Sequence, residues 1–397
     1  MSKRKIIFLK DVLVFTFTAF GGGQAHLAIM LKLFVRDRKY LTEEELLELN
    51  ALCAVLPGPS STQTLAAIAY KRGGIGLAVI SCLIWLLPAA AMMAIAALLI
   101  GRLSPEIGFT SIFRFIEPMA VGFVCYAAVL LAEKVIRTRF SVLVALIAAA
   151  TTVIFRSPYL FPLLIIGGGV LSSIVHRNKE ERELEETLIV NVNKKKLAAF
   201  FGILILFALL GALINRSSFF SLPVRLFENF YRNGALIFGG GQVLVPLLYT
   251  EFVELKGYLT SQDFLSGFAL QQIVPGPTFS FTSYVGGMAL KDQGTAGQLL
   301  GSTVAMIGIN LPGLILILFI VPFWESLKKI TRIKNSMIGI NAVAVGLMIA
   351  AAIIMFEPIA VGWLPVGLAL ITFVILSLTR IPVPVLFIAG MLLGIFL

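Results

Sequence analysis

The sequence predicts an all-α polytopic membrane protein made of two inverted-topology repeats, each of about six segments, and a helix that links them. Hydrophobic residues form 58% of the 397 residues, charged residues form 13%, and the mean hydropathy is +0.97. Soluble domains have about 45–50% apolar and about 25% charged residues, so lipid is the expected solvent for this fold. The other two observations are a series of long apolar stretches and a repeated pair of glycine and proline motifs.

About nine apolar stretches are near the length of roughly 17–25 residues that a membrane-spanning helix needs. Two of them, 140–155 and 382–397, are shorter than the others. The predicted spans are 74–100, 116–132, 140–155, 158–175, 197–214, 295–320, 336–355, 359–378 and 382–397.

The distribution of basic residues predicts the orientation in the membrane. If the N-terminus is cytoplasmic, 24 of the 32 Lys and Arg residues lie on the cytoplasmic side, as the positive-inside rule requires. The only long charged interruption, 176–196, has mixed signs, which argues for a cytoplasmic linker and against a nucleic-acid site. We therefore expect a multi-pass membrane protein with a cytoplasmic N-terminus.

Two motifs recur at one separation and indicate an internal repeat. The FGGGQ motif at 20–24 recurs at 238–242, and Pro-Gly-Pro at 57–59 recurs at 275–277. An odd number of crossings between the first Pro-Gly-Pro and the second FGGGQ inverts the second half, as in secondary transporters whose repeats meet at a midplane substrate site. The predicted divisions are an N-terminal repeat at 1–175, the charged linker at 176–196, a linking transmembrane helix at 197–214, and an inverted C-terminal repeat at 215–397.

The GGGQ and PGP segments are predicted to be broken or re-entrant helices. They could cross the membrane or return to the side from which they entered, and the inversion of the second half is the same in either case. Re-entry places Arg36, Arg38 and Lys39 on the cytoplasmic side, so the charge distribution mildly favours re-entry.

The breaks are candidate sites because lipid cannot satisfy the backbone groups that they free, so protein or a water-filled cavity must surround them. Amides at half-helix N-termini direct partial positive charge at an anion, and glycine allows that anion to approach closely. Nearby hydroxyls and amides can donate to a tetrahedral oxyanion without a buried cation. The candidate substrate-binding residues are Gly21, Gly22, Gly23, Gln24, Gly58, Ser60, Ser61, Thr62, Gln63, Gly239, Gly240, Gly241, Gln242, Gly276, Thr278 and Ser280.

The alternative is that the glycines only allow close helix packing and that Pro-Gly-Pro is a structural kink. The presence of Gln24 and Gln242 beside both glycine motifs favours a site, because a buried amide in a membrane needs partners.

Five ionisable residues near the breaks are candidates for a vestibule or for coupling. His26 could serve a proton-linked role or only packing, and its counterpart in the repeat is Leu244. Glu117, at the start of an apolar helix, could carry a coupling proton or be solvated at the interface. Lys71, Arg72 and Lys291 could form an electrostatic vestibule or act only as topology signals.

Neither a metal site nor a cofactor is predicted. Cys53, Cys82 and Cys125 stand singly in apolar segments, and His26 and His176 are the only histidines.

The motifs, taken together, resemble those of the chromate ion transporter family in its long-chain, two-domain form. They are FGGGQAHLAIM at 20–30, LPGPSSTQTLAAIAY at 56–70, FGGGQVLVPLL at 238–248 and QQIVPGPTFSFTSYVGG at 271–287. The resemblance implies export of chromate from the bacterial or archaeal cytoplasm across the inner (plasma) membrane, with sulfate as a chemically similar ligand, driven by the proton motive force.

Three functions compete at this stage. A secondary transporter would use the breaks as an alternating-access anion site; an uncoupled anion channel, or a transporter of another small anion, could use the same chemistry. An enzyme would need a nucleophile with a base or a redox centre, and we expect none. The expected partners are a small inorganic oxyanion and the lipid bilayer, with no nucleic acid; a homodimer is left open.

Overall fold

The all-α prediction is confirmed: the described part of the chain is helical and contains no strand. The computed structural model describes residues 2–20, 22–102, 115–157, 160–176, 202, 206, 221–238, 241–323, 331–357, 360, 362–379 and 381–396. Nearly all of the predicted linker and of the predicted linking helix 197–214 lies outside these residues.

Eight apolar helices coincide with the predicted spans other than 197–214. Four helical segments of the described chain are long and apolar enough to cross a membrane, and the other helices are shorter. The long ones belong to α4 (Ser60–Arg102), α6 (Ile116–Val135), α15 (Gly294–Ile320) and α17 (Thr331–Phe356). The shorter ones are α7 (Arg139–Phe155), α8 (Leu160–Val175), α18 (Trp363–Leu378) and α19 (Val383–Phe396).

The remaining elements follow the same order in the two halves. Each half has a first helix, a short helix that continues as a π-helix, a further helix before Pro-Gly-Pro, and a long segment after it. In the first half these precede α4 and are α1 (Lys3–Thr18), α2 (Gly22–Met30), η1 (Leu31–Asp37) and α3 (Glu43–Val55). In the second half they are α11 (Ser221–Leu236), α12 (Gly241–Tyr249), η2 (Thr250–Leu255), α13 (Ser261–Ile273), η3 (Thr278–Ser280), α14 (Phe281–Ala289) and η4 (Lys291–Gln293), before α15.

Local details also correspond between the halves. The Thr42 side chain accepts from the Glu45 N–H at the start of α3, and Thr260 accepts from the Asp263 N–H at the start of α13. Gly74 within α4 has φ 76° and ψ −170°, and Gly294 at the start of α15 has φ 71° and ψ −167°. These backbone angles lie where a side chain is disfavoured, so glycine allows the same kink in both halves.

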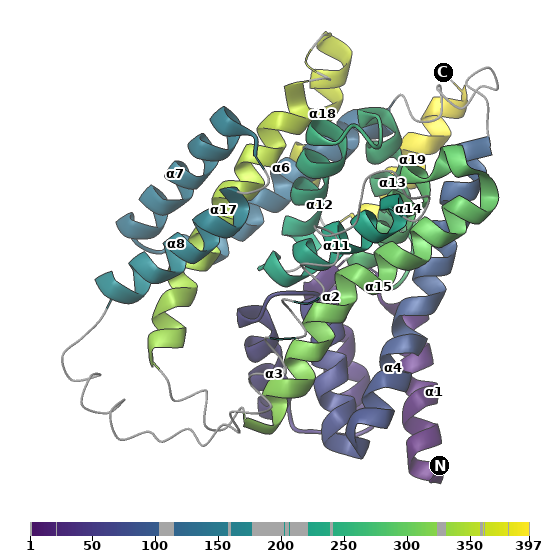
Figure 1. Cartoon of the computed structure of the whole chain (residues 1–397), viewed down its shortest axis with the longest axis vertical. Helices are drawn as coiled ribbons and strands as arrows, with labels where there is room; N and C mark the ends of the chain where they lie inside the picture. Colours follow the sequence, from purple (N-terminus) through teal and green to yellow (C-terminus); the bar gives the residue numbers. More distant parts are fainter. Residues whose placement is uncertain are drawn as a thin grey trace.

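The unbroken helices of the two halves pack against each other (Figure 1). The second-half helix α17 packs on α7 and α8, and α18 packs on the first-half helix α6. In the apolar window of α17, 72% is buried, against 33% for α4, so α17 lies at the centre of this group. The broken elements α1 to α4 and α11 to α15 form the other part of the molecule.

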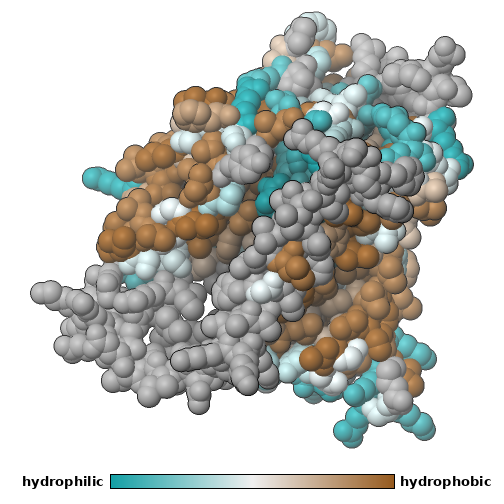
Figure 2. Space-filling view, viewed as in Figure 1, coloured by the Kyte–Doolittle hydropathy of each residue, from teal (hydrophilic) through white to brown (hydrophobic). Residues whose placement is uncertain are grey.

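The outer faces of the peripheral helices are apolar. Leu143 and Leu146 on α7 and Leu163 and Ile166 on α8 are each about 60% exposed. Figure 2 shows hydrophobic residues over these helices and hydrophilic residues gathered toward the ends of the molecule. This distribution is expected where lipid covers the sides of a helix bundle and water reaches its ends.

Candidate anion site

The two Pro-Gly-Pro breaks are satisfied by hydrogen bonds between the halves. Within Pro-Gly-Pro only the glycine has a backbone N–H, and lipid offers it no acceptor. The Gly58 N–H donates to the Ile237 carbonyl oxygen, and the Gly276 N–H donates to the Ala19 carbonyl oxygen, both at 2.8 Å. Ala19 and Ile237 follow the ends of α1 and α11, where helix termination leaves carbonyls without helical partners. The glycine N–H of each Pro-Gly-Pro break therefore bonds to a carbonyl oxygen just before the glycine motif of the other half.

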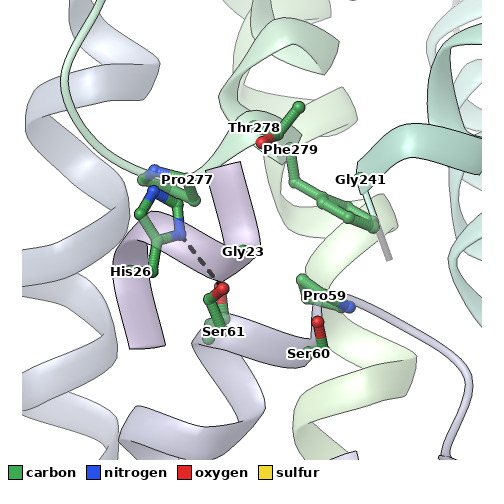
Figure 3. A pocket seen from close by; sticks show the side chains of 10 residues that line it. Gly23, His26, Pro59, Ser60, Ser61, Gly241, Pro277, Thr278 and Phe279 are labelled. Carbon is green, nitrogen blue, oxygen red and sulfur yellow. Dashed lines mark hydrogen bonds between the residues drawn. The ribbon is translucent and has the colours of Figure 1, made fainter. Parts of the chain in front are cut away.

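This exchange brings the N-terminal ends of several helices together. The N-terminal ends of α2, α4, α12 and η3 surround one pocket, which Figure 3 shows from close by. Its lining comes from both halves: Gly23, His26, Pro59, Ser60, Ser61, Thr62, Gly241, Pro277, Thr278 and Phe279.

Backbone donors lie at the start of α4. The first bond of this helix runs from the Gln63 N–H to the Pro59 carbonyl at 2.9 Å, so the N–H groups of Ser60, Ser61 and Thr62 come before the helical ladder. Those N–H groups and the helix macrodipole make this end favourable for an anion.

Hydroxyl groups supplement the backbone donors. The Thr62 oxygen accepts from the Trp85 indole N–H at 3.1 Å, which leaves the Thr62 hydroxyl proton free to donate. Thr278 and Ser61 lie near the glycines: a Cβ built on Gly241 would be 2.7 Å from the Thr278 Cβ, and one on Gly23 would be 3.7 Å from the Ser61 Oγ. Among the described residues, the pocket lining contains no Lys, Arg, Asp or Glu. The arrangement suits an oxyanion held by dipoles and neutral donors.

Of the described residues that line the pocket, His26 is the one with a titratable side chain. It lies on α2 with only 2% of its surface exposed, and its Nδ1 is 3.0 Å from the Ser61 Oγ. Its Nε2 is buried and has no hydrogen-bond partner among the described residues. The ring lies edge-on to Trp85 and Phe15 at centroid distances of 5.2 and 6.2 Å.

Several predicted site residues have structural partners instead of facing the pocket. The Gln63 amide nitrogen donates to the carbonyls of Pro57 at 2.8 Å and Gly313 at 3.1 Å, so it closes the backbone of the break. Gly58 and Gly276 make the cross-half bonds described above. Ser280 is buried outside the pocket lining, and Gly22 adjoins it, since a Cβ there would be 4.0 Å from the Thr278 Oγ1. Gly21, Gly239, Gly240 and the side chains of Gln24 and Gln242 lie outside the described part of the structure.

The charged residues of the candidate vestibule have protein partners. Lys71 pairs with Glu45 at 3.2 Å and Lys291 with Asp263 at 3.1 Å, at corresponding positions in the two halves. The Lys71–Glu45 pair is nearly half exposed, so its contribution to stability is small. The Thr42 N–H and Lys71 lower the pKa of Glu45.

The other two candidates also lie outside the pocket lining. The Arg72 guanidinium lies 4.2 Å from the Tyr40 ring centroid and donates to the Tyr40 carbonyl at 2.9 Å. Glu117 lies at the start of α6 and is partly buried.

Each half contains a helical hairpin, formed by α2, η1 and α3 in the first half and by α12, η2 and α13 in the second. Two buried carboxylates that sequence reasoning missed hold these hairpins in place. Asp11 on α1 accepts from Arg38 at 2.7 Å and from the Tyr40 hydroxyl. Burial and the bond to Asp11 raise the pKa of Tyr40 to about 12. In the second half the carboxylate lies on the π-helix instead: Glu251 accepts from Arg232 at 2.6 Å, Asn233 at 2.7 Å and Lys256 at 2.8 Å.

A third ion-pair cluster connects the two parts of the molecule. Arg156 follows α7 and donates to Glu357, after α17, at 2.7 Å and to Glu254 on η2 at 3.3 Å. Its left-handed backbone, with φ 42°, directs the chain away from α7. No motif identified these residues, because their partners are distant in sequence and differ between the halves.

Comparison with known proteins places these features in a family context. The sequence model of the family described as chromate transporter matches residues 7–173 and 224–395. A probable chromate transport protein of Synechococcus elongatus is 27% identical over 85% of this chain and 80% of its own length. A chromate transport protein of Cupriavidus metallidurans is 24% identical over 90% of this chain and 84% of its own length.

An uncharacterized transporter of Methanocaldococcus jannaschii is 26% identical over 84% of this chain and 80% of its own length. No solved structure shows a significant match to this chain.

Proposed function

Because the chain belongs to the chromate transporter family, we propose that it is a secondary transporter that exports a tetrahedral oxyanion, chromate or sulfate, from the cytoplasm with coupling to protons. The relatives that are named chromate transport proteins support the substrate class. The observation that carries the proposal is the pocket at which helix N-termini and hydroxyl groups of both halves meet. Such a group of donors can replace the hydration of an oxyanion without a buried cation.

The position of the pocket supports alternating access. It lies where the Pro-Gly-Pro and glycine breaks of the two halves exchange hydrogen bonds, so a displacement of either half changes its walls. A site between two repeats with opposite orientation can open to one side of the membrane at a time. The corresponding element order of the halves and the two regions matched by the family model agree with this arrangement.

The hairpins of the two halves differ in how they pack against the unbroken helices. In the second half, α12 packs on α17 and α13 packs on α6. Among the described residues, no comparable contact joins α2 to α6 or α3 to α17, the corresponding pairs of the first half. Among the described residues, the Arg156 ion pairs join the unbroken helices to the second-half hairpin only, and we call this cluster the latch.

This asymmetry supports a conformation that is closed on the second-half side. With a cytoplasmic N-terminus, the second-half hairpin faces outward, so the closed side is the outer one. The position in the first half that corresponds to Glu254 is Arg36, whose charge attracts anions on the cytoplasmic side. We therefore assign entry of the anion to the cytoplasmic side.

Loss of the latch should open the outer side. The cluster is partly exposed, so its ion pairs contribute roughly 1 kcal/mol, which corresponds to about a fivefold change in population. In Arg156→Gln, a Thr278→Cys reporter in the pocket should react about five times faster with an impermeant thiol reagent applied from outside.

Arg102→Gln is the matched control, because Arg102 donates to the Thr295 hydroxyl at 2.8 Å and makes no ion pair with a described residue. Equal reactivity of the reporter in wild type, Arg156→Gln and Arg102→Gln would show that the latch does not set the conformational equilibrium.

The function itself is tested by uptake of labelled chromate, and separately of sulfate, into inverted vesicles that contain the protein, with and without an imposed pH gradient. We expect accumulation that depends on the gradient. Flux that only follows the anion gradient would indicate a channel instead. Uptake of neither anion would refute the proposed substrate class.

A further inference from the structure

We propose that binding of the oxyanion and protonation of His26 are one coupled event, in which the protonated imidazole holds the Ser61 oxygen and releases the Ser61 hydroxyl proton toward the anion. This inference rests on the proposed function, since it concerns the same pocket. It assigns the coupling proton to His26 and places that proton in the same pocket as the anion.

The geometry allows only a few hydrogen-bond states. A neutral imidazole has one N–H, and a serine hydroxyl has one proton to donate. If Nδ1 is unprotonated, Ser61 donates to it across the 3.0 Å contact and presents only lone pairs to the pocket. In that state Nε2 carries a proton that has no acceptor among the described residues.

Protonation of both ring nitrogens changes what the pocket offers. Nδ1–H then donates to the Ser61 oxygen, so the Ser61 hydroxyl can donate to a bound anion. Nδ1 is the nitrogen that gains the proton, while Nε2 keeps its own proton, which has no acceptor among the described residues, and the ring gains a positive charge. A buried cation without a counterion is costly, and the oxyanion supplies that counterion. Each ligand therefore increases the affinity for the other, as linkage requires.

The neighbouring helices α1 and α4 present aromatic and hydroxyl side chains to His26. On α1, Asp11 pairs with Arg38, and Phe15 is the α1 residue that contacts the imidazole. On α4, Ser61 and Trp85 face the ring, while Lys71 and Arg72 lie ten or more residues beyond Ser61 and engage Glu45 and Tyr40. The segment Pro277–Phe279 contributes no charge. Among the described residues that line the pocket, only His26 has a titratable side chain.

The second half does not duplicate this group. The position corresponding to His26 is Leu244, which is fully buried. One chain therefore holds one proton with each anion at this site, and the bound dianion and proton together carry a net charge of minus one. The proton comes from solvent and returns to solvent when the anion leaves.

The experiment measures proton uptake directly. Chromate is titrated into the purified full-length protein in buffers of different ionisation enthalpy, at a pH where free chromate is fully deprotonated. We expect uptake of one proton per bound anion in wild type. We also expect the affinity to fall about tenfold per pH unit above neutrality, the slope for one linked proton.

Two variants separate this role from packing. His26→Asn places an amide N–H close to the position of Nδ1, so it should keep a donor to Ser61 and bind chromate with no proton uptake and no pH dependence. Ser61→Ala should bind more weakly but still take up a proton, because His26 remains. Proton uptake that persists in His26→Asn, or none in wild type that binds chromate, would overturn the inference.

Sulfate serves as the second probe because it stays a dianion throughout the working pH range. If both chromate and sulfate bind without proton uptake, the coupling is absent while the proposed function survives. If the folded protein binds neither anion, the proposed function fails and this inference fails with it.

Discussion

Gly241→Val should abolish oxyanion transport while the helix bundle stays folded. Gly241 begins α12 and lines the pocket, and a Cβ at this position would lie 2.7 Å from the Thr278 Cβ and 3.0 Å from its Oγ1. Thr278 also lines the pocket, so the new side chain must displace a hydroxyl donor or occupy the space of the anion. Overpacking of this kind costs about 1–3 kcal/mol, and the valine methyl groups add to it.

A graded series makes this prediction sharper. Gly241→Ala should lower the apparent affinity roughly 5- to 150-fold, the range that corresponds to about 1–3 kcal/mol. Gly23→Ala should have a smaller effect, because a Cβ there meets only the Ser61 Oγ at an ordinary contact distance of 3.7 Å. Initial rates of labelled chromate uptake into vesicles, normalised to the amount of inserted protein, give the comparison.

Gly167→Val is the matched control. Gly167 lies in α8, away from the hairpins, and a Cβ there has nothing within 4 Å. It should transport at the wild-type rate. Wild-type flux in Gly241→Val would show that the anion does not pass the α12 end of the pocket.

The apolar helices were predictable because their signal is local. The helices α6 and α17 each contain an apolar run long enough to cross the bilayer, and α7 is a shorter apolar run. Ser60, Ser61, Thr62 and Thr278 could be assigned to one site because they follow the duplicated Pro-Gly-Pro, and the structure places all four in the pocket lining.

The partners of the broken backbone could not be predicted, because nothing in an apolar residue marks its carbonyl as an acceptor. Ala19 and Ile237 accept the cross-half bonds through their backbone alone. Gln63 has a side chain suited to an anion, but the carbonyls of Pro57 and Gly313 need donors and take its amide. Phe279 lines the pocket although an aromatic residue in an apolar segment suggests only packing.

The ion pairs escaped prediction for a different reason. The buried carboxylate lies on α1 in the first half, at Asp11, and on η2 in the second, at Glu251. The position that corresponds to Asp11 is Asn229, so alignment of the halves conceals the shared role. That Asp11 and Glu251 play the same role becomes visible only in the folded protein, because they occupy different positions of the repeat.

Gly276→Ala should both destabilise the protein and abolish transport. Gly276 has φ 113°, a value that strains any other residue by about 1–3 kcal/mol. A Cβ would also lie 2.8 Å from the Ala89 Cβ on α4 of the other half. The added methyl group would therefore push the Pro-Gly-Pro segment away from α4 and disturb the Gly276–Ala19 hydrogen bond. We expect a lower melting temperature in detergent and transport at background level.

Gly58→Ala should behave in the same way, because Gly58 has φ 115° and a Cβ there would lie 2.9 Å from the Gly313 Cα. The control is Gly257→Ala, where φ is 57° and a Cβ has nothing within 4 Å, so that it introduces backbone strain without crowding. The two Pro-Gly-Pro variants should be less stable than this control by about 1–3 kcal/mol, the cost of overpacking. If all three variants have the same melting temperature and the same transport rate, the cross-half hydrogen bonds do not hold the site together. If only the Pro-Gly-Pro variants lose transport, closure of the breaks between the halves is what forms the pocket.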